Sequence, residues 1–550
     1  MFLTLLLVAL LLASAVSLVV GISAGVKIWV LQPALYAHDE FLPTMTPPQS
    51  GPDSAHRRLD ELPFDNRFAR LPPHFHTRLA PEPLPAPYLV AASPSAAALL
   101  GLEPAALAGE AFVESFAGNR LLPGSEPLAA VYSGHQFGVW AGQLGDGRAH
   151  LLGGVHTADG GYLEIQLKGA GKTPYSRFAD GRAVLRSSIR EFLCSEAMAA
   201  LGVPTTRALC VIGSDAPVVR ETVETAAVVT RLAPSFLRFG SFQHWAARAR
   251  PDALRELVAF VIDHHRPELR DTPRPVEALL ADVVRRTAVL IAHWQAVGFM
   301  HGVMNTDNMS ILGLTLDYGP FGFMEAYDPG HVCNHSDHEG RYAFDAQVQV
   351  GHWNLLALAG ALLPLIGAPD VAQGIVDELY PAAFTDTYLQ LMRAKLGLAC
   401  PKDEDEAFID ATLGLLARQR VDYPRFFRAL CHVRGTGGAV APTQEDAPLR
   451  DLFIDRGEAD AWLARWRARL RREGSNDAER PARQRQVNPK YVLRNWMAEA
   501  AIRGAVAGDV SELAAVLDAV THPYDELPEY ARYSAEPPDW AAGITVSCSS

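Results

Sequence analysis

Residues 129–242 are dominated by short runs in which apolar and polar positions alternate, and this period of two predicts β-strands. The clearest run is 163–168, where the apolar positions take one face and Glu164, Gln166 and Lys168 share the other. Further strands are expected at 130–132, 149–153, 207–212 and 226–232.

A helical period replaces this alternation from about residue 245 to residue 459. The run 282–297 repeats apolar residues as a buried helix does, and it ends at Gly298, directly before a polar loop. One earlier helix is expected inside the strand-rich part, starting at Ser188. Two more are expected at 460–473 and 490–519, on either side of a polar break at 474–486.

These patterns predict an α+β fold with two lobes, a strand-rich N-lobe at 126–242 and a helical C-lobe at 243–459. Residues 45–125 are rich in Pro and Ala and are expected to form a wrapping extension with little regular sheet. Residues 460–550 are expected to form a C-terminal helical extension with a Cys-Ser-Ser tail.

The first 44 residues differ from the rest of the chain. Residues 1–26 carry no charged side chain, so hydropathy predicts a signal peptide or a single membrane span. No Lys or Arg precedes this run, however, and Met45 opens a polar stretch that is typical of a soluble N-terminus. A targeting segment and a miscalled start both remain open. We expect a cytoplasmic protein, or an anchored or exported one if residues 1–30 are a genuine membrane segment.

The composition of the chain argues against several classes of protein. A hydrophobic share of 49% in 550 residues is enough for a large core. The net charge of −13 argues against a broad nucleic-acid surface. The six cysteines form no CxxC pair, which excludes the usual patterns of a structural zinc site or a secreted disulfide framework.

The polar loop 301–308 carries the strongest chemical signal. It ends in Asp307-Asn308, and Asp317 follows nine residues later, just before Tyr-Gly. Carboxylate and amide oxygens of this kind suit a nucleotide-bound Mg²⁺, which takes a few protein oxygens together with phosphates and water. Protein kinases place a catalytic Asp and a metal-binding Asn five residues apart, whereas here the two are adjacent.

The link between these two acidic positions is apolar. Residues 309–312 and 314–316 predict two short strands that are broken at Gly313. Such a hairpin would bring Asp307, Asn308 and Asp317 to one place.

Lys168 and Glu191 form a second candidate set. Lys168 ends the 163–168 strand, where a lysine can bind phosphate or can simply be solvated. Glu191 follows Ser188 by three residues, so it fits a helix capping box as well as an ion pair with Lys168. We favour the ion pair, because both residues occur in order with Asp307, Asn308 and Asp317.

Glycine and arginine clusters supply weaker candidates. Residues 142–148 read Gly-Gln-Leu-Gly-Asp-Gly-Arg, and such glycines let a backbone approach phosphates, although a plain hairpin turn is the commoner role. Residues 180–182, Asp-Gly-Arg, are a turn by default, and Arg231 and Arg238 could clamp phosphates. A further group matches no known zinc spacing and is expected in a loop beyond Asp317: His331, Cys333, His335, Asp337 and His338.

Several of these motifs together resemble the selenoprotein O (YdiU) family. The likeness runs from about residue 64 to the C-terminus and rests on residues 132–138 (Tyr-Ser-Gly-His-Gln-Phe-Gly), 143–148, 166–171, 173–177, 180–182, 186–191 and 301–308. The resemblance implies a protein-kinase-like fold, also called a pseudokinase fold, that binds ATP in a flipped orientation. It implies transfer of AMP to hydroxyl side chains (Ser, Thr or Tyr) of proteins, with transfer of UMP from UTP as a further possibility.

The resemblance also assigns roles, residue by residue. It implies that Asp307 is the proton acceptor and that Asn308 and Asp317 hold Mg²⁺ or Mn²⁺. The residues implied to bind the nucleotide are Gly145, Gly147, Arg148, Lys168, Asp180, Gly181, Glu191, Arg231, Arg238 and Asp317.

Two other functions remain open from the sequence. An ordinary kinase that transfers the γ-phosphate would share the Lys, Glu and Asp set. A catalytically silent nucleotide-binding scaffold is the other, although it does not need both a base and two metal ligands.

Cys548 lies third from the C-terminus, where some members of the family carry selenocysteine. Cys333 lies sixteen residues beyond Asp317, in the region that corresponds to a kinase activation loop. A disulfide between the two would tether the tail across the cleft and make activity depend on reduction, and a free terminal thiol is the equally weighted alternative.

Overall fold

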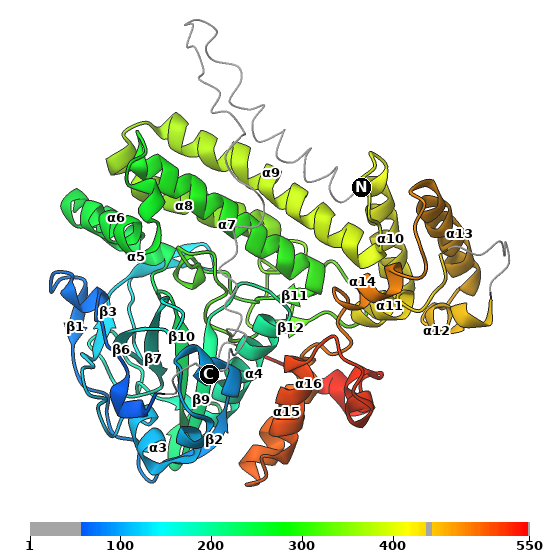
Figure 1. Ribbon diagram of the computed structural model, residues 1–550. Coiled ribbons are helices and arrows are strands. Elements are labelled where there is room, and N and C mark those ends of the chain that lie inside the picture. The colour runs from blue at the N-terminus through cyan, green and yellow to red at the C-terminus, as the bar shows by residue number, and fades with distance from the viewer. Residues whose placement is uncertain (1–56, 436–442, 548–550) are drawn as a thin grey trace, which may run out of the picture.

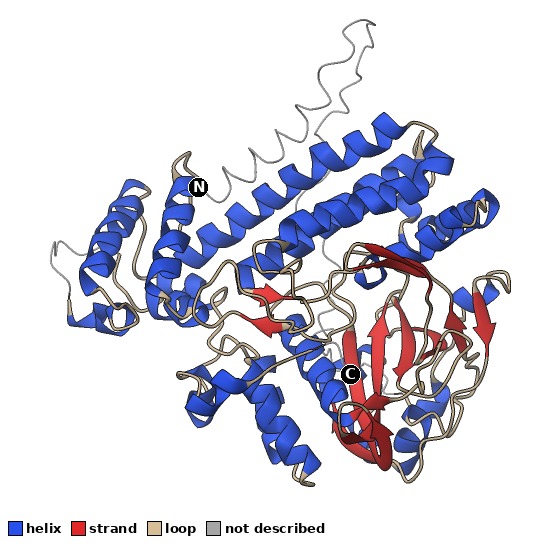
Figure 2. Ribbon diagram, turned by 180° about the vertical axis from the view of Figure 1, so that it is seen from behind, coloured by secondary structure: helices blue, strands red, loops and turns tan. Residues whose placement is uncertain are grey.

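The structure is a computed structural model that describes residues 57–435 and 443–547 (Figure 1). One large antiparallel sheet occupies one part of the molecule, and long helices pack together in the other. Seen from behind, the strands cluster on one side and the helices extend away from them (Figure 2). The chain is therefore an α+β protein, as the sequence predicts.

The large sheet has the order β1-β3-β6-β7-β10-β9-β2, and β8 also pairs with β10. Its strands are β1 (His76–Arg78), β2 (Tyr88–Ala92), β3 (Leu128–Ala130), β6 (Ala149–His156), β7 (Tyr162–Lys168), β8 (Ala183–Val184), β9 (Arg207–Val219) and β10 (Val223–Ala233). A separate pair, β4 (Ser133–Gln136) and β5 (Val139–Gln143), forms a hairpin beside it, and β11 (Phe299–Met300) pairs with β12 (Gly322–Phe323).

Two of these strands correct an expectation. Residues 45–125 were expected to hold little regular sheet, but β1 and β2 come from this segment and pair with β3 and β9. Both strands are short, and each lies at one end of the strand order, β1 at one edge of the sheet and β2 at the other. Edge strands of three to five residues leave little periodicity in a sequence, which is why the alternation rule missed them.

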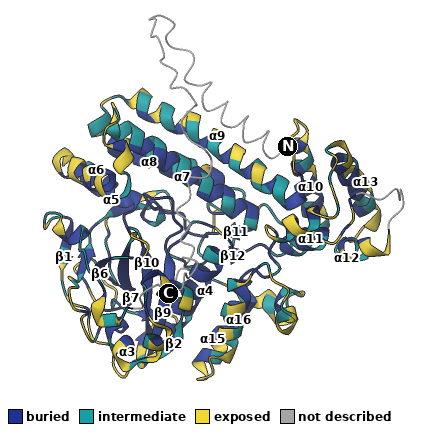
Figure 3. Cartoon of the chain, in the orientation of Figure 1, coloured by how far each residue is buried: buried dark blue, intermediate teal, exposed yellow. Residues whose placement is uncertain are grey.

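Both faces of the large sheet are covered, so the central strands β6 and β7 are almost entirely buried (Figure 3). Alternate residues of β10 enter different cores, with Val229 on the side of α4 (Leu185–Ala200) and Val228 on the other. The second face is covered by α2 (Pro94–Leu99) and α3 (Glu110–Phe116).

The helical part is built around three long helices that pack on one another, α7 (Pro275–Val297), α8 (Gln347–Ile366) and α9 (Pro369–Leu396). A proline opens α7, and Gly298 ends it in the left-handed conformation with φ 75°, as the sequence predicts. Among the described residues, α8 alone is long and apolar enough to cross a membrane. Its packing against α5 (Phe239–Ala247), α7 and α9 accounts for this composition.

Shorter helices complete the fold. They are α6 (Pro251–His265), α10 (Asp405–Gln419), α11 (Tyr423–Leu430), α12 (Ala447–Arg450), α13 (Arg456–Arg472), α14 (Arg480–Arg485), α15 (Asn495–Val506) and α16 (Ser511–Thr521). The last two pack against α4, so the C-terminal part of the chain buttresses the helix that carries Glu191 (Figure 1).

Two local predictions are wrong. The helix α4 begins at Leu185, and Ser188 lies inside it, so no capping box links Ser188 with Glu191. Residues 309–316 form a turn closed by the isolated bridge Met309–Thr315, not two strands. The expected hairpin shape is kept all the same, because Gly313 turns the chain with φ 69°.

Candidate active site

A pocket of about 860 Å³ lies where the sheet meets the helical part. It is lined by the glycine loop after β5, by β7, by α4, by β10 and by the loop 303–308. The residues predicted to act as the base or to bind nucleotide or metal all line it: Gly145, Gly147, Arg148, Lys168, Asp180, Gly181, Glu191, Arg231, Arg238, Asp307, Asn308 and Asp317.

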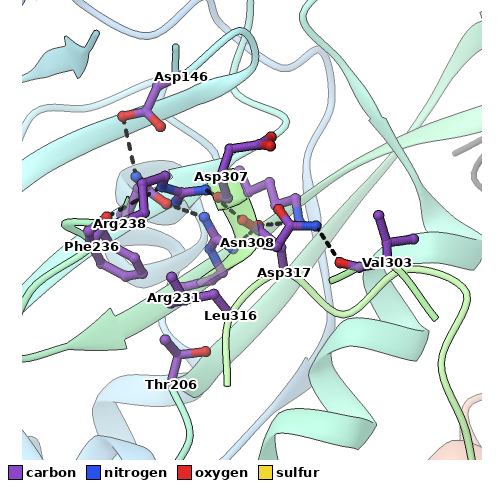
Figure 4. A network of polar contacts seen from close by, with 12 residues as sticks. Asp146, Thr206, Arg231, Phe236, Arg238, Val303, Asp307, Asn308, Leu316 and Asp317 are labelled. Atoms are coloured by element: carbon purple, nitrogen blue, oxygen red, sulfur yellow. Dashed lines mark hydrogen bonds and ion pairs between the residues drawn. The ribbon is translucent and has the colours of Figure 1, made fainter. Parts of the chain in front are cut away.

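Asp317 is the centre of a charged network (Figure 4). Its Oδ1 lies 3.0 Å from Lys168 Nζ and also pairs with Arg231, and its Oδ2 lies 2.8 Å from an Arg238 guanidinium nitrogen. Burial by itself raises the pKa of Asp317, but the charges of Lys168, Arg231 and Arg238 outweigh it and hold this pKa well below its usual range. Asp317 is therefore an anion near neutral pH.

Glu191 completes the network from the side of α4. Its Oε2 lies 2.7 Å from Lys168 Nζ, and its Oε1 lies 3.0 Å from Arg231. The side chains of Glu191 and Arg231 are buried, with 4% and 2% exposed. A buried charge needs such partners, so Glu191 and Asp317 together hold Lys168 and Arg231 in place.

Asp307 is in a different environment. Its carboxylate points away from Asp317 and the arginines (Figure 4). Gln136 donates from its amide to Asp307 Oδ2 at 3.2 Å, and Oδ1 is buried without a hydrogen-bond partner among the described residues. Burial raises the pKa of Asp307 to about 6. A carboxylate of this kind is ionised near neutral pH and still basic enough to take a proton.

Asn308 and Asp317 are the residues that could hold a metal ion. The Asn308 amide nitrogen donates to the Val303 carbonyl at 3.0 Å, so its oxygen is the end left to act as a ligand. One amide and one carboxylate oxygen fit Mg²⁺, which completes its shell with phosphates and water. Within the described residues no group of three His, Cys, Asp or Glu side chains could hold a metal, and this includes the segment 331–338.

The loop 171–182 folds over the glycine loop. Thr173 Oγ1 donates to the Asp146 carbonyl at 2.7 Å, and a Cβ on Gly145 would overlap the Tyr175 ring. Asp180 pairs with Arg220 at 2.7 Å, and Gly181, with φ 75°, packs directly on the Gly171 backbone. Both glycines are therefore required by close approach, and the two loops form one wall of the pocket.

A model of the family "Protein adenylyltransferase SelO" matches residues 58–521. The chain belongs to the SelO family. A relative from Dechloromonas aromatica (strain RCB), named "Protein nucleotidyltransferase YdiU", is 63% identical over 487 residues, which cover 88% of this chain and 97% of the relative. Relatives with the same name from Ralstonia nicotianae (strain ATCC BAA-1114 / GMI1000) and Herminiimonas arsenicoxydans are 58% and 55% identical and cover 88% and 90% of this chain and 95% and 98% of their own lengths. The chain is therefore a protein nucleotidyltransferase, and AMP transfer fits the family description.

Some residues of this SelO-family site escaped the sequence reasoning. Gln136 holds Asp307, the Arg238 guanidinium lies 4.6 Å from the centre of the Tyr132 ring, and Arg220 holds Asp180. Gln136 and Asp307 are 171 positions apart, and no local pattern signals a pairing over that distance. Only the glycines around Gln136, in Ser-Gly-His-Gln-Phe-Gly, hint at a special backbone.

Cys333 is buried, and its thiol donates to the Pro320 carbonyl at 3.0 Å. The described end of the tail lies nearby, because the His335 backbone N–H donates to the Val546 carbonyl at 2.8 Å. Cys548 lies outside the described residues. The disulfide between Cys333 and Cys548 stays a prediction.

Proposed function

We propose that this SelO-family protein moves AMP from ATP to a Ser, Thr or Tyr hydroxyl of an acceptor protein and releases pyrophosphate, on a protein-kinase-like bilobal fold. The observation that carries the proposal is that one pocket holds two distinct groups, a set of cations suited to a leaving pyrophosphate and a separate carboxylate suited to accept a proton. Three cations surround Asp317, while Asp307 stands apart with a pKa of about 6.

The cations suit the leaving group. When pyrophosphate leaves, negative charge builds up on its oxygens, and fixed positive groups stabilise that charge in a buried site. Lys168, Arg231 and Arg238 are held in position by Glu191 and Asp317 before any ligand binds, so little reorganisation is needed. Arg148, which lines the same pocket, adds a further positive charge.

Asp307 suits the proton transfer. The acceptor oxygen attacks the α-phosphorus, the bond from that phosphorus to the pyrophosphate oxygen breaks, and the hydroxyl proton passes to the Asp307 carboxylate. Asn308 and Asp317 would hold Mg²⁺ or Mn²⁺, which neutralises phosphate charge when it is bound. Gln136 keeps the Asp307 side chain in one orientation.

The test is to analyse the modified acceptor after incubation with ATP labelled at the α- or the γ-phosphate. AMP transfer labels the acceptor from α-labelled ATP alone and releases pyrophosphate. Label from the γ-phosphate with release of ADP would mean a kinase, and nucleotide binding without any transfer would mean a silent scaffold. Replacing ATP by labelled UTP, with Mg²⁺ or Mn²⁺, decides between AMP and UMP and between the two metals.

A further inference from the structure

The hairpin of β4 and β5 lies directly against the loop that carries Asp307. The His135 backbone N–H donates to Thr306 Oγ1 at 2.7 Å, and the Phe137 backbone N–H donates to Asn305 Oδ1 at 3.0 Å. Together with the bond from Gln136 to Asp307, these contacts place the tip of the hairpin at the base. Any hydroxyl that reaches Asp307 therefore arrives beside this tip.

One face of the hairpin carries an apolar side chain that is open to solvent. Gln136 pairs with Val139 across the hairpin, so the two side chains leave the same face with Cβ atoms about 5 Å apart. Val139 is 71% exposed. Trp140 belongs to the opposite face, where it pairs with His135. An exposed valine thus stands next to the residue that holds the base.

Phe137 is the second apolar group, and the turn itself does not favour it. Phe137 and Gly138 have φ of 50° and 80°, the two positive values of a turn that prefers Asn-Gly. A phenylalanine there is strained by about 1 kcal/mol, yet Phe137 is 38% exposed and lines the pocket. Its one ring partner among the described residues is Tyr342, with centroids 5.2 Å apart. Exposed aromatic side chains at strained positions are typical of binding surfaces.

We propose that this tip, made of Gln136, Phe137 and Val139, is the docking site of the acceptor protein. It takes an extended acceptor segment whose hydroxyl residue lies at Asp307 and whose neighbouring residue is apolar and packs on Phe137 and Val139. The inference rests on the proposed function, because it is the transfer reaction that brings a polypeptide to Asp307. It adds a sequence preference that the transfer chemistry by itself does not require.

The experiment uses the full chain, ATP labelled at the α-phosphate, and two synthetic peptides with a single Ser. One peptide has Leu on both sides of the Ser, and the other has Asn. Wild type is expected to prefer the Leu peptide by about tenfold in kcat/KM, the size of effect that one buried apolar side chain gives. Phe137→Asn, which suits the turn better, and Val139→Asp should both bring the ratio close to one. Val139 does not line the pocket, so Val139→Asp should also leave KM for ATP unchanged.

Val506→Asp is the matched control, because Val506 is 67% exposed on α15 and does not line the pocket. It should keep the preference of the wild type. Equal kcat/KM for the two peptides in wild type, or the same loss in Val506→Asp as in Val139→Asp, overturns the proposal. If wild type labels itself but neither peptide, the docking proposal fails and AMP transfer stands. If it labels neither itself nor a peptide, AMP transfer fails as well.

Discussion

Asp307 and Asp317 are ten positions apart and line one pocket, but their surroundings move their pKa values in opposite directions. Burial outweighs the opposing charge of Arg238 and raises the pKa of Asp307 to about 6, whereas the charges of Lys168, Arg231 and Arg238 hold that of Asp317 well below its usual range. When their environments separate the pKa values of two carboxyls in this way, one can act as a base while the other stays an anion. The roles proposed for Asp307 and Asp317 thus rest on the surroundings of each side chain as well as on its chemistry.

Asp307→Asn tests the base. The amide keeps the shape of the side chain and cannot take a proton, so kcat should fall by about 10²–10⁴. The Kd for ATP with Mg²⁺ should stay within about twofold, because Asp307 is directed away from the cations that would bind phosphates. Steady-state labelling and calorimetric titration measure the two quantities, and a kcat near that of wild type would refute the assignment.

Glu164 allows a prediction on stability. Burial raises its pKa to about 8 in the folded protein, from an ordinary value of 4.5. Its contribution to stability is therefore complete below about pH 4.5 and is lost as the pH rises to about 8. Glu164→Gln cannot ionise, and its amide oxygen can still accept from the Phe236 N–H, now at 2.9 Å from the carboxylate. Wild type loses stability between pH 5 and pH 8, and Glu164→Gln does not. The free energy of unfolding of the variant minus that of wild type should therefore rise by about 2–4 kcal/mol over this range. A difference that does not change with pH, in denaturant unfolding curves, would contradict this.

At the scale of elements, the site depends on how β7, β10 and α4 present their side chains. Lys168 on β7 and Arg231 on β10 lie on adjacent strands and face Glu191, which α4 supplies from above the sheet. The loops 142–148 and 171–182 then close the wall beside them. Each element supplies one part of a network that none could form alone.

Lys168 and Glu191 should behave as a unit. Lys168→Ala and Glu191→Ala should each lower kcat/KM by a similar factor, and the double variant should be little worse, because each single change already removes the pairing. Glu191 also pairs with Arg231, so the fall in kcat/KM caused by Glu191→Ala should be at least as large as the fall caused by Lys168→Ala. The three variants are compared by labelling kinetics, and losses that simply add would show that the two side chains act independently.

Gly181 should be intolerant of a side chain. With φ 75° and the Gly171 backbone against it, Gly181→Ala must displace the loop 171–182 and weaken nucleotide binding by about tenfold or more. Gly160→Ala is the control, because Gly160 has φ 85° and nothing within 4 Å of an added Cβ. That control should cost only the strain of about 1–2 kcal/mol in stability and leave the Kd for ATP unchanged. Equal effects of the two substitutions on this Kd would argue against the packing role.

At the scale of the whole molecule, the pocket joins the sheet to the helical part. Arg238, just before α5, binds the Asp307 carbonyl at 2.7 Å and Asp317 at 2.8 Å, and Arg190 of α4 donates to the Phe321 carbonyl at 2.9 Å. A ligand held by these residues should therefore stabilise both parts at once.

Thermal unfolding tests this. At about 100 times its Kd, ATP with Mg²⁺ should stabilise the folded protein by about 2.7 kcal/mol and raise the temperature of a single transition. Asp317→Ala should lose the part of this shift that depends on Mg²⁺, since it removes the carboxylate proposed to hold the ion. Separate transitions for the two parts, or an undiminished Mg²⁺ effect in the variant, would count against the common site.

The sequence alone determined the class of fold, the main helices and the candidate site residues that line the pocket, because period, glycine stops and charged motifs are local properties of the chain. Residues 282–297 and Gly298 illustrate this, since apolar spacing and the left-handed glycine act within one element. Edge strands β1 and β2, the start of α4, and the pairing of Gln136 with Asp307 were decided by the tertiary structure. The physical reason is that pairing and burial, not the local propensity of the chain, stabilise these features, and the partners lie far away in the sequence. Lys168 is an example, because a lysine at a strand end becomes a site residue only when Glu191 and Asp317 enclose it.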